Sequence, residues 1–291
     1  MSESPHRRAS ITLYVISCFF FWISLYTYVP TLPTYAESKS SSLELVGVVL
    51  MQYGLWQTII RIPVGILSDW IGRRKPFILG GMVLAGVAAF IMGHAAGING
   101  LILGRAVSGL AASAWVVLIV AFSSLFPPDQ AVRASTLLNL VASTGRVLAT
   151  GSNGWLIQLQ GYAFPFTVAA VGAMLAVVLL MPVREKVFPG KAPSLGSFLR
   201  LASRQDVMLP TLLSTLGQYV AFATTLGFIP IIAEHLGASH VVQSLMVSGS
   251  MIVGILGNLL STAVIRQIGS RRLVAFCFVV SAVGVAAARI S

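Results

Sequence analysis

Four arginines stand inside long apolar stretches of the sequence. They are Arg61, Arg105, Arg146 and Arg289. A charged side chain in apolar surroundings is costly unless it faces water, an ion partner or a ligand, so it marks a candidate functional site. A guanidinium stays charged and donates several hydrogen bonds, which suits it to anionic groups. These arginines therefore indicate ligand binding or charge coupling.

A polar and aromatic face is predicted on the stretch 43–67. Tyr53, Trp56, Gln57 and Arg61 recur at helical spacing and therefore share one side of a helix. We expect that side to line a cavity, and an interfacial aromatic belt is the alternative. Further candidates for the cavity are Trp115, Arg146, Gln218 and Tyr219. The Phe19–Trp22 run is assigned to lipid contact or core packing.

The charge balance inside the apolar stretches is positive. No Asp or Glu lies in the middle of any stretch, so the cavity is predicted to be net cationic and to suit an anionic or zwitterionic ligand. For Arg61 and Arg289 the alternative is that the charged head reaches the edge of the apolar layer.

Signs of catalysis are missing from the sequence. Neither H-E-x-x-H nor G-x-S-x-G occurs. The four histidines have no acid or thiolate at metal-ligand spacing, and the two cysteines, Cys18 and Cys277, cannot build a zinc cluster. We therefore expect no enzyme, no metal and no cofactor.

Composition predicts an all-α membrane protein with many spans. Only 9% of the 291 residues are charged, 56% are hydrophobic, and mean hydropathy is +0.89, which excludes a soluble globule and a disordered chain. A spanning helix needs about 20 apolar residues. Nine stretches qualify, at 11–33, 43–67, 76–96, 100–126, 134–158, 162–182, 207–233, 240–265 and 272–290.

Positive charge predicts the orientation. With a cytoplasmic N-terminus, fourteen of the nineteen Lys and Arg residues fall on the cytoplasmic side, as the positive-inside rule requires of a protein in the cell membrane. They are Arg7, Arg8, Arg73, Arg74, Lys75, Arg133, Arg184, Lys186, Lys191, Arg200, Arg204, Arg266, Arg271 and Arg272. The net charge of +11 then needs no nucleic-acid partner.

An internal repeat predicts two related halves. A polar linker at 183–206 separates six stretches, in residues 1–182, from three in residues 207–291. An offset of 197 aligns Pro33 with Pro230 and Gly72 with Gly269. By the same offset Ser291 falls on the end of the third stretch, so we expect a second six-helix copy that is incomplete here; a natural nine-helix protein is the alternative.

The loop after the second stretch, GILSDWIGRRK, resembles motif A of the major facilitator superfamily, G-x-L-x-D-x-x-G-R-[KR]. Its matching residues are Gly65, Leu67, Asp69, Gly72, Arg73 and Arg74. The resemblance implies a loop that latches the two halves, with Arg133 as the expected partner of Asp69. We further expect Gly65 to allow close helix packing and Gly72 to allow a sharp turn. The alternative for the basic residues is that they only anchor topology.

Two further patterns resemble the drug-efflux branch of that family. The first stretch ends PTLP, and LILGRAVSGLAAS resembles motif B through Arg105 and Gly109, with departures at Ser108 and Ala111. This likeness implies a coupling role for Arg105; bonding to backbone carbonyls is the alternative. Residues 149–154 read ATGSNG and lack the proline of the antiporter motif, which argues against proton-driven antiport.

The resemblance implies a secondary active transporter that moves a small molecule by alternating access, with efflux favoured. Its partners would be the substrate, the lipid bilayer and, as a candidate coupling ion, protons. The alternatives are a truncated membrane protein that does not transport and an uptake carrier for a small anionic or zwitterionic metabolite.

Overall fold

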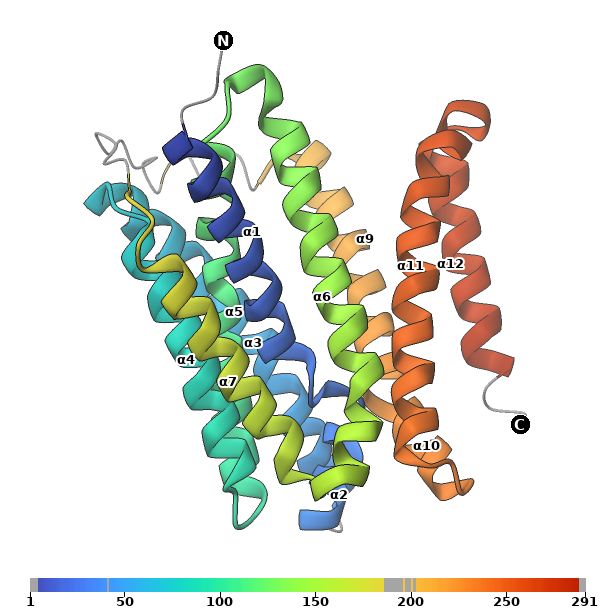
Figure 1. Cartoon of the computed structure of the whole chain (residues 1–291). Helices are drawn as coiled ribbons and strands as arrows, with labels where there is room; N and C mark the ends of the chain where they lie inside the picture. The colour runs from blue at the N-terminus through green and yellow to red at the C-terminus, as the bar shows by residue number, and fades with distance from the viewer. Residues whose placement is uncertain (1–4, 41, 186–195, 197–199, 201–202, 288–291) are drawn as a thin grey trace.

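The computed structural model describes residues 5–40, 42–185, 196, 200 and 203–287, and in these residues it contains helices and turns but no strand (Figure 1). Within them, nine helical segments follow the nine predicted stretches, so the all-α fold class is confirmed. Most of the predicted linker 183–206 lies outside the described residues, as does Arg289.

The first six segments pack side by side (Figure 1). Their helices are α1 (Pro5–Tyr26) with the turn η1 (Val29–Thr31) and α2 (Leu32–Lys39), α3 (Leu43–Ile71), α4 (Lys75–Gly93), α5 (Ile98–Ser123), α6 (Ala131–Gln160) after the turn η2 (Pro128–Gln130), and α7 (Ala163–Leu180). The last three are α9 (Gln205–Ala221) with the π-helical turn η3 (Phe222–Phe228) and α10 (Ile229–His235), α11 (His240–Ile268) and α12 (Ser270–Ala287).

Seven helical stretches among the described residues are long and apolar enough to cross a membrane. The predicted spans at α6 and α12 are helical but are not among those seven. For α6 the reason is its polar content, which includes Asn139, Arg146 and Asn153. Polar side chains on a membrane helix need a partner or a cavity, and α6 indeed faces other helices on several sides, since it contacts α1, α5, α7 and α11.

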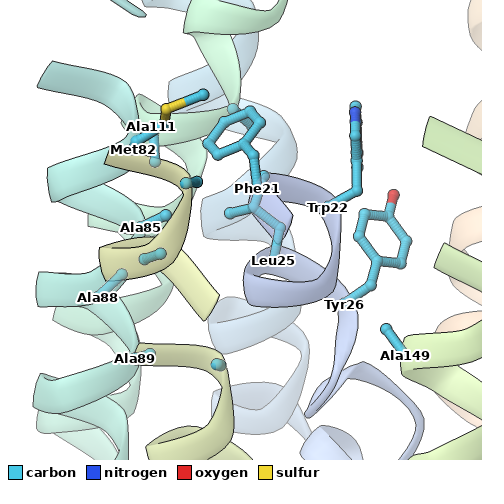
Figure 2. Packing of buried hydrophobic residues seen from close by; sticks show 14 of the residues in the cluster. Phe21, Trp22, Leu25, Tyr26, Met82, Ala85, Ala88, Ala89, Ala111 and Ala149 are labelled. Carbon is cyan, nitrogen blue, oxygen red and sulfur yellow. The ribbon is translucent and has the colours of Figure 1, made fainter. Parts of the chain in front are cut away.

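Small side chains bring the helices of the first bundle together. Figure 2 shows Met82, Ala85 and Ala88 of α4 on the side of α1 that carries Phe21 and Leu25. A Cβ on Gly81 of α4 would lie 2.3 Å from the Ala114 Cβ of α5, so these two helices require glycine there. Close backbone approach through small residues is how membrane helices gain packing energy without a hydrophobic driving force.

Two backbone features recur at the offset of the sequence repeat. Gly72 and Gly269 both have positive φ, 69° and 81°, in the turns α3–α4 and α11–α12. Pro33 and Pro230 both stand at the start of a short helix, α2 and α10, that follows an irregular turn. Proline fits the first helical turn because it has no N–H to leave unpaired. The left-handed glycine thus recurs at the repeat offset, whereas the segment before the proline is the 3-10 turn η1 in the first case and the π-helical turn η3 in the second.

The two groups of helices meet near one end. Toward the bottom of Figure 1, α6 approaches α11 and α2 approaches α10, whereas α6 and α11 diverge toward the top. We call the lower end, with the turns 94–97, 161–162 and 236–239, the joined end. The upper end, which carries the start of α1 and the turns at 72–74 and 181–185, is called the basic end.

Candidate functional site

Arg105 is buried inside the first bundle. It stands on α5 and is only 4% exposed. Its guanidinium carbon lies 4.3 Å from the centre of the Tyr53 ring of α3, a distance at which the negative ring face stabilises the cation. Its Nε and Nη1 atoms have no hydrogen-bond partner among the described residues. The alternative of bonding to backbone carbonyls is therefore not realised by these two nitrogens.

Arg146 forms a second cationic position on α6. Its guanidinium carbon lies 4.9 Å from the Trp22 ring centre and 5.7 Å from that of Tyr26, both on α1. Its Nη2 donates to the Ser143 hydroxyl at 3.0 Å. Trp22 also meets Trp115 of α5 edge to face, with 5.3 Å between ring centres. Trp22 and Tyr26 of α1 and Trp115 of α5 thus form an aromatic wall beside the half-buried Arg146 guanidinium of α6.

The two cationic positions belong to one set of contacts. Tyr26 interacts electrostatically with Tyr53, and Tyr28 interacts in the same way with Arg105. We call the set Trp22, Tyr26, Tyr28, Tyr53, Arg105, Trp115 and Arg146 the central cluster. Neither arginine forms an ion pair with a described carboxylate. The centre is therefore cationic and aromatic, and it offers hydrogen-bond donors.

Four of the predicted cavity and coupling residues meet in this cluster, namely Tyr53, Arg105, Trp115 and Arg146. The others do not. Arg61, Gln218 and Tyr219 are exposed, Gln57 is half-buried, and Trp56 donates to Gln52 Oε1 at 2.9 Å. Gly109 has a packing function, because a Cβ there would lie 2.6 Å from the Tyr53 carbonyl oxygen.

Trp22, Tyr26 and Tyr28 were not predicted as site residues. Figure 2 shows Trp22 and Tyr26 on the side of α1 that faces Ala149 of α6, away from Phe21. Within the Phe19–Trp22 run, Phe21 therefore packs in the core between helices, whereas Trp22 belongs to the central cluster. The four-residue spacing of Trp22 and Tyr26, which places them on one helix face, was the signal in the sequence.

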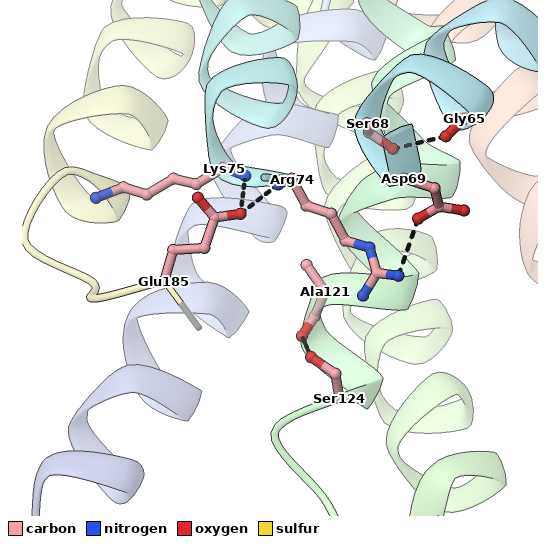
Figure 3. A network of polar contacts seen from close by, with 8 residues as sticks. All are labelled: Gly65, Ser68, Asp69, Arg74, Lys75, Ala121, Ser124 and Glu185. Atoms are coloured by element: carbon pink, nitrogen blue, oxygen red, sulfur yellow. Dashed lines mark hydrogen bonds and ion pairs between the residues drawn. The ribbon is translucent and has the colours of Figure 1, made fainter. Parts of the chain in front are cut away.

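The α3–α4 turn at the basic end holds the motif A residues (Figure 3). Gly72 ends α3 with φ 69°, a conformation that costs little only for glycine. Arg74 Nη2 then lies 3.0 Å from Asp69 Oδ1. The Glu185 carboxylate accepts hydrogen bonds from the backbone N–H groups of Arg74 and Lys75, the latter at 2.7 Å. It thus stabilises the first, unpaired N–H groups of α4.

The predicted pairing of Asp69 with Arg133 is not made. Arg133 is exposed at the start of α6, and among the described residues Asp69 pairs with Arg74, which the tight turn brings back beside it. Arg73 and Leu67 are exposed. The close packing expected at Gly65 is also not observed, since a Cβ there would meet no atom within 4 Å.

Glu185 was missed in the sequence. It lies 110 residues from Lys75, in a linker rich in Lys and Arg. Nothing in the sequence except its negative charge distinguishes it from its neighbours. Lys75 reinforces the same junction, because its Nζ donates to the Met181 and Val183 carbonyls at 2.6 and 2.7 Å. These contacts fasten the end of α7 to the start of α4.

Neutral polar groups connect the two groups of helices near the joined end. The fully buried Asn153 of α6 accepts hydrogen bonds at Oδ1 from the hydroxyls of Thr31, at 2.9 Å, and Ser244 of α11, at 3.1 Å. Ser248 donates to the Val147 carbonyl at 3.0 Å. Gly154 lets the backbones touch, because a Cβ there would lie 2.4 Å from the Val241 Cα.

Ionisable side chains lie at the outer rim of the same junction. Glu37 of α2 accepts from His235 of α10 at 3.1 Å. Tyr162, in the turn before α7, packs edge to face on His240 at 5.0 Å. Burial raises the pKa of the Tyr162 phenol, and a hydrogen bond with Thr34 partly offsets that rise. The joined end thus brings α2, α7, α10 and α11 together.

Fold and site define a multi-pass helical membrane protein with a cationic centre beside a junction of two helical groups. The sequence profile of the Major Facilitator Superfamily matches residues 14–288, and the chain belongs to that family.

Relatives and solved structures agree with this assignment. The chain is 38% identical to the inner membrane transport protein YajR of Escherichia coli over 97 residues, 33% of this chain and 21% of that protein. It is 24% identical to multidrug resistance protein 1 of Bacillus subtilis over 62% of this chain and 46% of that protein. A crystal structure of a bacterial homolog to the human lysosomal transporter Spinster, inward-facing and occupied, matches with a TM-score of 0.72 and 18% identity, over 93% of this chain and 63% of that one. The matches to these proteins thus span less than two thirds of their own lengths.

Proposed function

We propose that the chain acts in secondary active transport, moving a small molecule across the cell membrane by alternating access. The observation that carries this proposal is that α6 and α11, one from each helical group, are joined near one end and diverge toward the other. In carriers of this kind, two bundles rock about a site near the middle of the membrane. The central cluster lies on the helices next to the junction, where such a site belongs.

The basic end is proposed to face the cytoplasm. Arg7, Arg74, Lys75 and Arg133 all belong to it, and cytoplasmic loops carry the excess of Lys and Arg in membrane proteins. With this orientation the junction closes the external side, and the conformation described above is inward-facing.

Export is the proposed direction, with a proton gradient as the first driving force to test. The resemblance of the PTLP and motif B segments to the drug-efflux branch supports export. So does the similarity to multidrug resistance protein 1 of Bacillus subtilis, whose name states a role in drug resistance.

Locking the joined end tests alternating access. Asn153→Cys and Ser244→Cys would replace two side chains whose oxygens lie 3.1 Å apart, in a background with Cys18→Ala and Cys277→Ala. The protein is placed in lipid vesicles, and flux is measured for labelled salicylate, tetraphenylphosphonium and a neutral nucleoside, with and without a pH gradient. We expect saturable flux of at least one solute class that oxidation abolishes and a reductant restores.

Each single-cysteine variant is the matched control and should keep its flux under oxidant. Equal flux in the oxidised and reduced double variant, with the disulfide shown by mass spectrometry, would contradict alternating access at this junction. Absence of flux for every solute class would contradict transport by this chain.

A further inference from the structure

We propose that the central cluster binds an organic anion that carries a flat ring, with the anionic group at Arg146 and the ring against Trp22 and Trp115. This inference rests on the proposed transport function, because it names the class of molecule that the carrier would move.

The first support is an excess of hydrogen-bond donors. Within the cluster the buried nitrogen atoms that lack a partner are Nε and Nη1 of Arg105 and Nε1 of Trp22. Each of them can only donate a hydrogen bond. Buried polar groups are normally paired, and each exception needs an explanation such as a water, an ion or a ligand. A set of donors without acceptors fits a ligand that brings acceptor oxygens.

The second support is charge. Arg105 and Arg146 both carry a positive charge, and no described carboxylate pairs with either of them. An unpaired buried charge is strongly unfavourable, and an opposite charge at short range relieves it. An anionic ligand would supply that charge, whereas a cationic ligand would add to the repulsion.

The two arginines differ in the access they offer. Arg105 is almost fully buried and held against Tyr53, so it acts mainly as a fixed source of positive potential. Arg146 is half-buried, and one of its nitrogens is oriented by Ser143. Its guanidinium can therefore meet a carboxylate directly, in the two-bond geometry that arginine and carboxylate favour.

The flat ring follows from the aromatic wall. Trp22 and Trp115 meet edge to face beside the Arg146 guanidinium, which already lies over the Trp22 ring. Aromatic side chains pack against planar rings in stacked or edge-on arrangements with a gain beyond simple burial. A ligand that has both an anionic group and a ring would use both features, and a plain inorganic anion would use only one.

The experiment measures binding to the purified chain in detergent by titration calorimetry. Three probes of similar size separate the features. They are 1-naphthoate, with ring and negative charge, decahydronaphthalene-1-carboxylate, with charge but no flat ring, and 1-naphthylmethylammonium, with ring and positive charge. We expect the first to bind at least tenfold more tightly than either of the others. Equal or tighter binding of the ammonium probe would overturn the proposal, and so would equal binding of the saturated acid.

Variants assign the site. We expect Arg146→Gln to weaken 1-naphthoate binding at least tenfold and Arg146→Lys to weaken it less, because the lysine keeps the charge but loses the planar pair of donors. Arg184→Gln, at an exposed arginine of the basic end, and Trp155→Phe, at a half-exposed tryptophan of α6, are matched controls and should bind as the parent does. Unchanged binding in Arg146→Gln would place the anion elsewhere and overturn the proposal. If that variant does not fold, the probe ranking and the Arg146→Lys result still decide.

The ligand proposal and the transport proposal can be contradicted independently of each other. Selective 1-naphthoate binding without flux in vesicles would support the site and contradict the transport function. Flux of other solutes together with no binding of 1-naphthoate would support transport and overturn the ligand class.

Discussion

The joined end and the basic end are stabilised by different chemistry. At the joined end, the contacts between α6 and α11 are neutral hydrogen bonds, from Ser244 to Asn153 and from Ser248 to Val147, together with close backbone packing at Gly154. At the basic end, an ion pair and a charged helix cap connect residues of the first six segments to one another. Neutral bonds that cross between the groups are individually modest, so they can be exchanged during a conformational change. The charged contacts instead stiffen one group as a unit.

The largest effect is expected from adding a side chain at Gly154, where α6 and α11 touch. In Gly154→Ala the added Cβ would lie 2.4 Å from the Val241 Cα and 2.5 Å from the His240 carbonyl oxygen. Both are backbone atoms, so the helices must separate. Overpacking of this kind costs about 1–3 kcal/mol, and we expect a clear fall in the thermal unfolding temperature in detergent. Gly47→Ala, where a Cβ meets nothing within 4 Å, is the matched control. Equal melting of the two variants would show that the junction is looser than described.

The next effect concerns the turn that both copies share. Gly72→Val places a branched side chain at φ 69°, and Gly269→Val does so at φ 81°. The left-handed conformation costs a non-glycine residue roughly 1–2 kcal/mol, and we expect each variant to lower the unfolding temperature. Gly72→Asn should be milder, because asparagine tolerates this region. The turn comparison fails if valine is as well tolerated as asparagine at position 72.

A smaller effect is expected at the helix cap. Glu185→Ala removes the acceptor for the backbone N–H groups of Arg74 and Lys75 and the negative charge at the start of α4. Loss of a helix cap costs about 1 kcal/mol. The measurement is thermal stability together with hydrogen exchange of these two amides, which should become faster. Asp129→Ala, at an exposed acid in η2, should change neither quantity. Unchanged exchange at Lys75 would exclude Glu185 as the cap.

The smallest effect is expected at the rim of the joined end. Glu37 and His235 lie 3.1 Å apart, but the histidine side chain is 63% exposed, and exposed pairs contribute roughly 0–1 kcal/mol. A double-mutant cycle with Glu37→Gln and His235→Gln should give a small coupling energy, because an exposed pair gains little over its contacts with water. A coupling above about 2 kcal/mol would mean that this rim is charged and rigid, like the basic end.

Much of the fold could be predicted from the sequence, because membrane helices need long apolar runs and the glycines and prolines of the repeat dictate local backbone. Tyr53, Arg105, Trp115 and Arg146 were predicted because polar and charged side chains are rare inside such runs. Three-dimensional neighbours were not predictable in the same way. The partner of Asp69 was set by how tightly Gly72 turns the chain, and Glu185 reached α4 across 110 residues. Trp22 was assigned to packing because composition alone does not tell which side of a helix faces α6.

The makeup of the hydrophobic core bears on how the chain is made. Among the residues whose burial the structure describes, every member of the main buried cluster except Ile231 comes from positions 14–183. During synthesis, a ribosome that has completed the first six helical segments has delivered nearly all the side chains that this core needs. The first bundle can therefore consolidate in the lipid before the later helices emerge, and those helices dock onto a surface that already exists.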